Sequence, residues 1–146
     1  MKIIYNNIVP LRGYDAMCIY PFIFVRNDRR QYFTKKTETH ECIHAYQQIE
    51  TCVLCLLVLL LLAGVGLVSF WWLLASPLAF FVLYALEYTV KGLFYLPFHK
   101  SKADPQSTSV YLKVSFEREA YANEGDAGYP DSRKPFAWLH YLFRPE

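Results

Sequence analysis

Residues 51–86 read TCVLCLLVLLLLAGVGLVSFWWLLASPLAFFVLYAL, a block of 36 residues without a charged side chain. A helix that spans a bilayer needs about 20 apolar residues. The block is too long for one spanning helix and suits two, so it predicts a transmembrane helical hairpin, which we place at residues 51–98. The favoured break is Ser76-Pro77, because proline ends or kinks a helix. The rival break, Gly64-Val65-Gly66, predicts a shorter re-entrant hairpin.

The composition of the whole chain agrees with this block. The 146 residues suffice for a single domain, and hydrophobic residues make up 54% of them against 19% charged, which is more apolar than an average soluble domain. We therefore expect a small membrane protein with the lipid bilayer as a partner. The alternative is a buried helical hairpin in a soluble oligomer. The net charge of +2 and the scattered basic residues argue against nucleic acid as a partner. The oligomeric state stays open.

Basic residues predict the topology of the hairpin. Seven Lys and Arg residues precede the apolar block, eight follow it, and the expected turn has none. Since cytoplasmic segments carry the excess of Lys and Arg, we expect a multi-pass protein with both ends on the cytoplasmic side, in a bacterial inner membrane. The cysteines Cys18, Cys42, Cys52 and Cys55 indicate no disulfide framework, which favours a reducing compartment.

Residues 1–36 have the pattern of short strands and turns. The segments Met17–Tyr20 and Phe22–Val25 are rich in aromatic and β-branched residues. Pro21 between them cannot donate a ladder hydrogen bond and so indicates an edge strand or a bulge. We expect a short β segment here, along whose edge an extended peptide could lie.

A helix is expected over residues 34–50, with Thr34 or Thr37 as its N-cap. It carries the motif HExxH at His40-Glu41-Cys42-Ile43-His44. Because His40 and His44 are four residues apart, both imidazoles project from one face and can bind a single Zn²⁺. Glu41 lies one step round the helix, where it can act as general base towards a metal-bound water molecule.

A catalytic zinc site usually needs a third protein ligand. Glu50 is the nearest carboxylate, but the helix carries it about 9 Å beyond His44, and Gln47 stands where the related pattern HExxHxxGxxH has its turning glycine. The better choices are Glu117 and Glu119, on a helix expected within residues 107–125 and stopped by Gly125. Spacing alone leaves both open.

The order of HExxH, an apolar hairpin and a helix bearing Glu-x-x-Ala resembles the membrane-embedded gluzincin metallopeptidases of the HtpX and CAAX-prenyl-protease type. The resemblance implies that His40, His44 and Glu117 hold zinc, with Glu119 as the alternative third ligand, and that Glu41 is the base. It implies a peptide or membrane-protein substrate. Tyr121 departs from it, standing where these peptidases have an aspartate that orients the ligands. Most of the C-terminal region that would wall a substrate cleft is also missing.

Residues 116–142 also look like small HExxH proteins of Bacteroidetes and their phages, which pair an HExxH helix ending in Gln-Gln with Phe-Glu-x-Glu-Ala-Tyr and a closing Trp segment. This resemblance covers more of the chain and implies no activity. It includes much of the aromatic C-terminal segment, residues 126–146, where His140 is a candidate stabiliser of an oxyanion.

The sequence thus predicts a single, mainly α (α+β) domain with a membrane hairpin between two site-bearing helices. The expected function is that of a membrane zinc metallopeptidase, in which an activated water molecule attacks a peptide bond with Glu41 as general base. The alternative is a non-catalytic, metal-binding membrane accessory or interaction protein.

Overall fold

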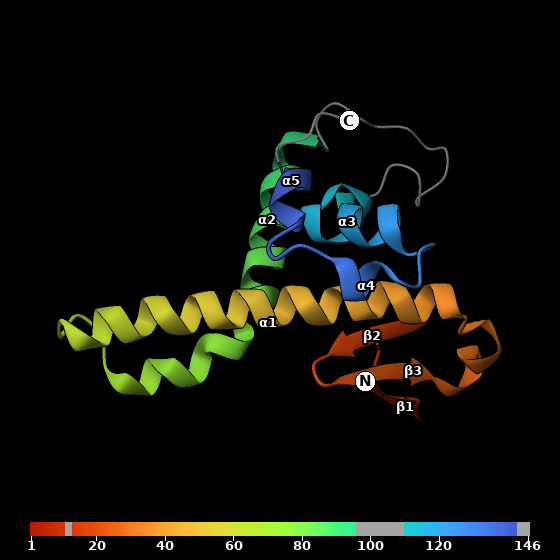
Figure 1. The fold of residues 1–146 in the computed structure, drawn as a ribbon, viewed down its shortest axis with the longest axis horizontal. Helices are drawn as coiled ribbons and strands as arrows, with labels where there is room; N and C mark the ends of the chain where they lie inside the picture. Colours follow the sequence, from red (N-terminus) through yellow and green to blue (C-terminus); the bar gives the residue numbers. More distant parts are fainter. Residues whose placement is uncertain (11–12, 96–109, 143–146) are drawn as a thin grey trace.

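The computed structural model describes residues 1–10, 13–95 and 110–142 and shows a mainly helical chain with a small N-terminal sheet (Figure 1). This confirms the expected fold class. The elements in chain order are β1 (Lys2–Asn6), β2 (Ala16–Ile19), β3 (Phe22–Arg26), η1 (Asn27–Tyr32), α1 (Lys35–Gly64), η2 (Phe70–Leu78), α2 (Ala79–Tyr95), η3 (Val110–Lys113), α3 (Ser115–Asn123), α4 (Tyr129–Ser132) and α5 (Trp138–Leu142).

The sheet has the order β1-β3-β2, with β1 parallel and β2 antiparallel to β3. The strands β2 and β3 match the two segments that the sequence predicts, and β2 is an edge strand as expected. Alternate residues of β3, Ile23 and Val25, are buried, as the two-residue period of a strand requires. The opposite edge of the sheet is β1.

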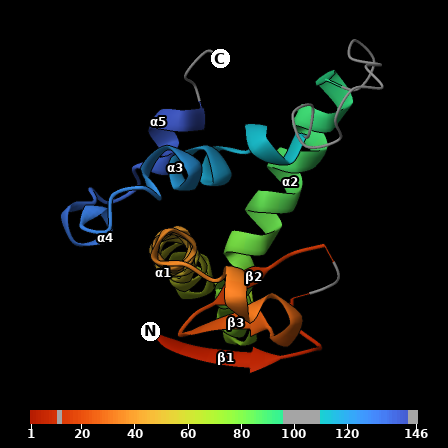
Figure 2. The same ribbon diagram turned by 90° about the vertical axis from the view of Figure 1, so that its right-hand side faces the viewer.

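The long helix α1 runs through the HExxH motif into the apolar block without interruption. Its N-cap is Thr34, whose hydroxyl accepts a hydrogen bond from the backbone N–H of Thr37, and no proline or glycine lies between that cap and Gly64. The sheet lies on one side of α1, and α3 and α5 lie on the other (Figures 1 and 2). The helix is therefore the central element of the fold.

The apolar block reverses direction earlier than expected. The helix α1 ends at Gly64, and Gly66 adopts a positive φ of 76°, which glycine accepts without steric cost. The chain returns along α1 as η2, and Pro77 lies inside η2 just before α2 begins. The rival glycine break thus makes the turn, and the favoured proline marks the start of the next helix. Residues 96–98 of the expected hairpin lie outside the described residues.

The expected helix over residues 107–125 is divided. Residues 107–109 lie outside the described residues, η3 is a single short 3-10 turn, and α3 then runs to Asn123 with Glu124 as its C-cap. The expected C-terminal segment contains the short helices α4 and α5, and residues 143–146 are not described.

A small apolar cluster joins α2, α3 and α5. Phe116 of α3 packs against Trp138 with ring centroids 4.6 Å apart and against Phe80 of α2 with centroids 4.9 Å apart. Val114 completes the cluster. These contacts hold α3 in place beside α1 and so fix the helix that carries Glu117.

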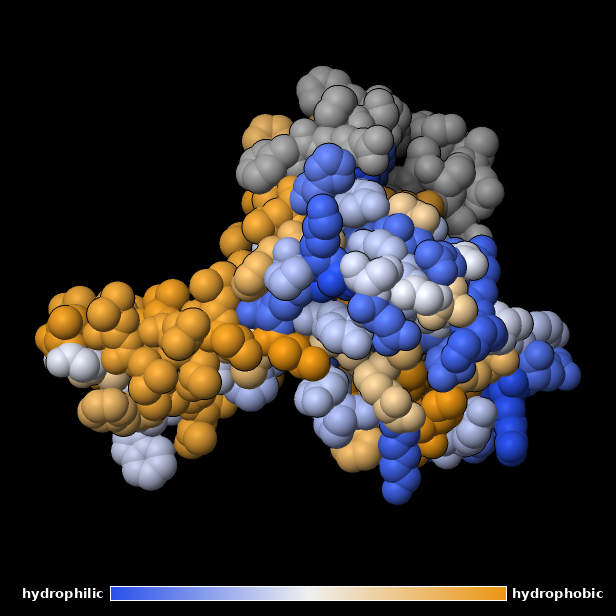
Figure 3. Space-filling view, in the orientation of Figure 1, coloured by the Kyte–Doolittle hydropathy of each residue, from blue (hydrophilic) through white to orange (hydrophobic). Residues whose placement is uncertain are grey.

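Two stretches are long and apolar enough to cross a membrane, Lys35–Gly64 and Phe70–Phe94. Most of their apolar windows are unburied: only 22% and 11% of the residues, respectively, are buried within the protein. The space-filling view shows the resulting hydrophobic arm beside a more polar body (Figure 3).

Candidate metal centre

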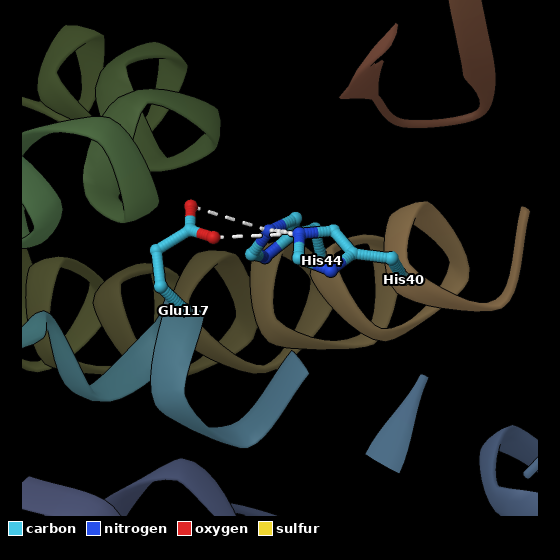
Figure 4. Close-up of side chains that lie close together, drawn as sticks. All are labelled: His40, His44 and Glu117. Atoms are coloured by element: carbon cyan, nitrogen blue, oxygen red, sulfur yellow. Dashed lines mark hydrogen bonds and ion pairs between the residues drawn. The ribbon is translucent and has the colours of Figure 1, made fainter. Parts of the chain in front are cut away.

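The three expected zinc ligands converge between α1 and α3. His40 and His44 project from one face of α1, and Glu117 points towards them from α3 (Figure 4). All three side chains are buried, and their ligand atoms lie within 4.8 Å of one another. Residues about 70 positions apart in the chain thus form one group of two imidazoles and one carboxylate, which could hold a metal ion.

The spacing of these atoms fits a tetrahedral ion. The Nε2 atoms of His40 and His44 lie 3.1 Å apart, and each lies near one oxygen of Glu117, at 3.3 Å and 3.4 Å. Ligand atoms about 2.0–2.1 Å from a tetrahedral zinc ion are about 3.3 Å from each other. The three side chains need little rearrangement to share an ion of that size.

The other nitrogen of each imidazole is held by a hydrogen bond. His40 Nδ1 lies 2.9 Å from Glu124 Oε2, and His44 Nδ1 lies 2.7 Å from Gln47 Oε1. Because a carboxylate and an amide oxygen only accept, each Nδ1 carries the proton and donates it. In the neutral form of each imidazole the Nε2 lone pair is then directed into the group, which is the tautomer that a metal ligand requires.

Both oxygens of Glu117 face the histidines, and one of them is also held by a tyrosine. Its Oε1 accepts a hydrogen bond of 3.1 Å from the Tyr84 hydroxyl of α2. Its Oε2 is buried with no hydrogen-bond donor among the described residues, although His40 Nε2 lies within ion-pair distance of it. Burial alone would raise the pKa of Glu117, but the adjacent imidazoles of His44 and His40 hold that pKa well below its usual range. The carboxylate is therefore ionised, with an oxygen free for a cation.

The alternative third ligand, Glu119, is directed elsewhere. Its carboxylate is fully buried and pairs with Arg133, and it also accepts hydrogen bonds from Tyr129 and from Gln47. The metal-ligand group in the described part of the chain includes Glu117 and leaves Glu119 out. Through Gln47, however, Glu119 supports the hydrogen bond that orients His44.

The remaining carboxylate of α1, Glu50, is also neutralised by Arg133. The guanidinium lies between Glu50 and Glu119 and donates to both. Burial alone would lower the pKa of Arg133, but its hydrogen bonds to Glu50 and Glu119 raise it above its already high value. Arg133 thus joins α1 to α3 one side chain away from the metal ligands.

Glu41 lies beside the group and next to the sheet. Its side chain is buried and lies close to the backbone of Cys18 in β2. Gln48, two turns further along α1, bonds to the same strand through the Cys18 carbonyl and the Tyr20 N–H. These contacts fix the position of the expected base relative to the edge strand.

An open cavity of about 1570 Å³ adjoins His40 and Glu41. The walls are built by the segment before β2, by α2 and by α3, so parts of the chain that are distant in sequence meet around it. Tyrosines line much of it: Tyr14, Tyr84, Tyr88, Tyr111, Tyr121 and Tyr141.

Two further residues that the sequence singles out are His140 and Tyr121. His140, the candidate oxyanion stabiliser, is exposed on α5 and is absent from the cavity lining, whereas its neighbour Tyr141 is part of that lining. Tyr121 packs edge-on against His40 with ring centroids 4.8 Å apart. One turn later, at the C-cap of α3, the Glu124 carboxylate lies 2.9 Å from His40 Nδ1.

Comparisons of the chain with protein-family models, with curated proteins and with solved structures find no match.

Proposed function

We propose that this protein is a membrane-attached zinc metallopeptidase of the gluzincin type, with His40, His44 and Glu117 as zinc ligands and Glu41 as general base. The observation that carries the proposal is the convergence of the three ligand side chains, with both Nε2 lone pairs directed inward. The order of HExxH, an apolar hairpin and a carboxylate on a later helix supports the same family resemblance.

Zinc is the metal that this donor set favours. Two neutral imidazoles and one carboxylate form the His₂Glu set of many zinc hydrolases, which leaves a fourth coordination position open. Calcium and magnesium prefer sites made of oxygen atoms alone. The free cysteines Cys18, Cys42, Cys52 and Cys55 lie outside the group, so the donor set contains no thiolate.

Zinc bound at this site would lower the pKa of a water molecule and polarise a substrate carbonyl group. Glu41 would be the residue that accepts a proton from the attacking water and returns it to the leaving nitrogen of the peptide bond. The Glu41 side chain is buried beside β2 and lines the cavity, which places it where a general base would act. Glu124 and Gln47 keep the two imidazoles in the ligating tautomer.

A peptide is the substrate class that the edge strand favours. The Asp15 carbonyl accepts a hydrogen bond from the Arg26 N–H of β3. In an antiparallel pair, the residue that follows such a bonded residue directs its own N–H and C=O away from the partner strand. That residue is Ala16, which lines the cavity beside Glu41. An extended peptide could pair with it as an added strand, with its scissile bond near the metal ligands.

The test combines metal analysis with a protease assay on purified full-length protein. We expect about one zinc ion per chain in the wild type and a loss of zinc in His44→Ala. Glu41→Gln should keep its zinc and lose peptide hydrolysis, since a general base contributes about 10²–10⁴-fold. The matched control is Glu38→Gln, a half-exposed carboxylate on the preceding turn of α1, which should behave as wild type.

Each result separates the two candidate functions. Zinc binding with hydrolysis that depends on Glu41 supports the peptidase. Stoichiometric zinc with no such hydrolysis refutes it and leaves the metal-binding accessory protein. Wild-type protein without zinc, or with zinc that survives in His44→Ala, refutes the metal site itself.

A further inference from the structure

The helix α2 is amphipathic, with its polar side chains towards the body of the protein and its apolar side chains outward. Its polar side chains face the body: Glu87 accepts hydrogen bonds from the backbone N–H and hydroxyl of Ser115, and Lys91 pairs with Glu87. On the outward face, apolar side chains recur at intervals of four, four and three residues and are exposed: Val82, Leu86, Val90 and Leu93. A soluble helix places its apolar stripe inward, so the outer face of α2 requires an apolar environment.

A second apolar surface extends from the base of this helix. We use the term arm for residues 52–78, the C-terminal part of α1 together with η2. Thr51 is buried in the body, whereas Leu61 is 69% exposed, Leu67 72% and Trp71 80%. The two helices of the arm pack against each other, and each leaves its outer face exposed. The arm contains no charged residue.

The arm and the outer face of α2 form one continuous surface. In the space-filling view the hydrophobic colour covers the projecting arm and continues up the flank of the body where α2 lies (Figure 3). The ribbon views agree that α2 runs across the direction of α1 (Figures 1 and 2). If the arm is placed perpendicular to a flat surface such as a membrane, α2 therefore runs roughly along that surface.

We propose that the arm enters a lipid bilayer from one side without crossing it, and that α2 lies in the interface of the leaflet through which the arm enters. From Thr51 to Gly64 the helix rises about 20 Å at 1.5 Å per residue. The hydrocarbon core is about 30 Å thick, so the arm reaches past one leaflet and falls short of the far side. This geometry replaces the two-span hairpin expected from length alone.

Two observations favour lipid over a second copy of the chain as the occupant. A partner subunit covers one face, whereas the arm is apolar on the outer faces of both its helices. The tip also satisfies backbone donors internally: the N–H groups of Val65, Gly66 and Leu67 donate to carbonyls of the last turn of α1. Since unpaired backbone groups are costly in hydrocarbon, a tip whose N–H groups are hydrogen-bonded internally is suited to burial in lipid.

This placement brings the cavity of the candidate metal centre to the membrane surface. Tyr84 and Tyr88 of α2 line that cavity, while the opposite side of the same helix faces lipid. The membrane geometry does not depend on zinc or on catalysis, so it can be tested separately from the proposed function.

The test is thiol accessibility in cells. In a full-length variant with the four cysteines replaced by alanine, Ser69→Cys places one thiol at the exposed tip of the arm, and Lys134→Cys places one on the body. A membrane-impermeant maleimide is added to spheroplasts and to inverted membrane vesicles of bacteria that express each variant. We expect the tip thiol to be protected in both preparations until detergent is added, and the body thiol to react in one of them.

Three results would overturn the proposal. Labelling of the tip in the preparation where the body thiol stays protected indicates two full spans. Labelling of the tip together with the body indicates an arm in water. Protein that leaves the membrane fraction in alkaline carbonate indicates that another protein covers the arm.

A second measurement uses folded, purified protein and vesicles of phosphatidylcholine and phosphatidylglycerol. Leu86→Glu on the outer face of α2 should weaken vesicle binding by about tenfold or more, because a buried leucine contributes that much to partition. The control Ile8→Glu changes an apolar residue that is even more exposed than Leu86 but lies away from the surface described above, and it should bind as wild type. Equal binding by both variants contradicts the interfacial placement of α2.

Discussion

His40 Nδ1 lies 2.9 Å from a carboxylate oxygen of Glu124, the residue that caps the helix carrying Glu117. Outer partners of this kind orient a ligand and typically contribute 10–100-fold to metal affinity. We therefore expect Glu124→Gln to weaken zinc binding by about 10–100-fold with little loss of stability, measured by competition with a chromogenic chelator. Asp131→Asn removes the same charge from an exposed position and is the control. Equal affinity in both variants would exclude Glu124 from this role.

Glu117 and Glu119 are separated by the structure into two roles, which a pair of variants can distinguish. Glu117→Gln removes the anionic ligand, so we expect loss of zinc with the metal-free fold retained. Glu119→Gln leaves the ligands in place but removes a buried partner of Arg133, so we expect lower thermal stability and nearly normal zinc stoichiometry. Metal analysis and thermal unfolding of both variants would check this, and the reverse pattern would refute the assignment.

The local pattern of α1 predicts half of the candidate site. His40 and His44 follow from four-residue spacing, and the position of Glu41 follows from the same helix. Gln47 could have been found in this way, because it lies three residues after His44 and so shares its face. The choice between Glu117 and Glu119 does not follow from spacing, since both lie on α3 and the docking of that helix decides which one faces α1. That docking depends on Phe116, Trp138 and the capping contact from Glu87.

Other features depend on contacts that no local pattern contains. Glu124 lies 84 residues from His40, and Arg133 lies 83 residues from Glu50. Arg133 sits in the segment between α4 and α5, where neither helical nor strand periodicity predicts the direction of a side chain. The cavity also arises only when α2 and the segment before β2 come together. The sequence predicts the fold class and the ligand types, whereas the orienting partners and the cavity require the tertiary structure.

Arg133 is nearly inaccessible, with 2% of its side chain exposed, and it neutralises two carboxylates. Removing one partner of a buried ion pair leaves uncompensated charge and typically costs about 3–5 kcal/mol. We expect Arg133→Met to lower the free energy of unfolding by about that amount, measured by denaturant titration in detergent. Adding Glu50→Gln and Glu119→Gln to the same chain should restore part of the loss.

Lys35 provides the control for this variant, because it pairs with Glu38 on the surface with 69% of its side chain exposed. Exposed ion pairs contribute little to stability, so Lys35→Met should unfold much as the wild type does. An Arg133→Met variant as stable as Lys35→Met would show that the two carboxylates need no guanidinium.

Cys18 gives the fold a dependence on alkaline pH. Burial, followed by the nearby charges of Glu41 and Cys42, raises the pKa of the Cys18 thiol from 9.0 to about 12. The folded state therefore keeps a proton that the unfolded chain loses, so the contribution to stability is complete below pH 9.0 and is lost as the pH rises towards about 12.

In this window we expect the wild type to lose up to about 1.4 kcal/mol of unfolding free energy per pH unit more than Cys18→Ala. Denaturant titrations of both proteins, with a chelator present, at about pH 8 and about pH 10.5 would measure the difference. Parallel losses in the two proteins would show that this thiol titrates normally.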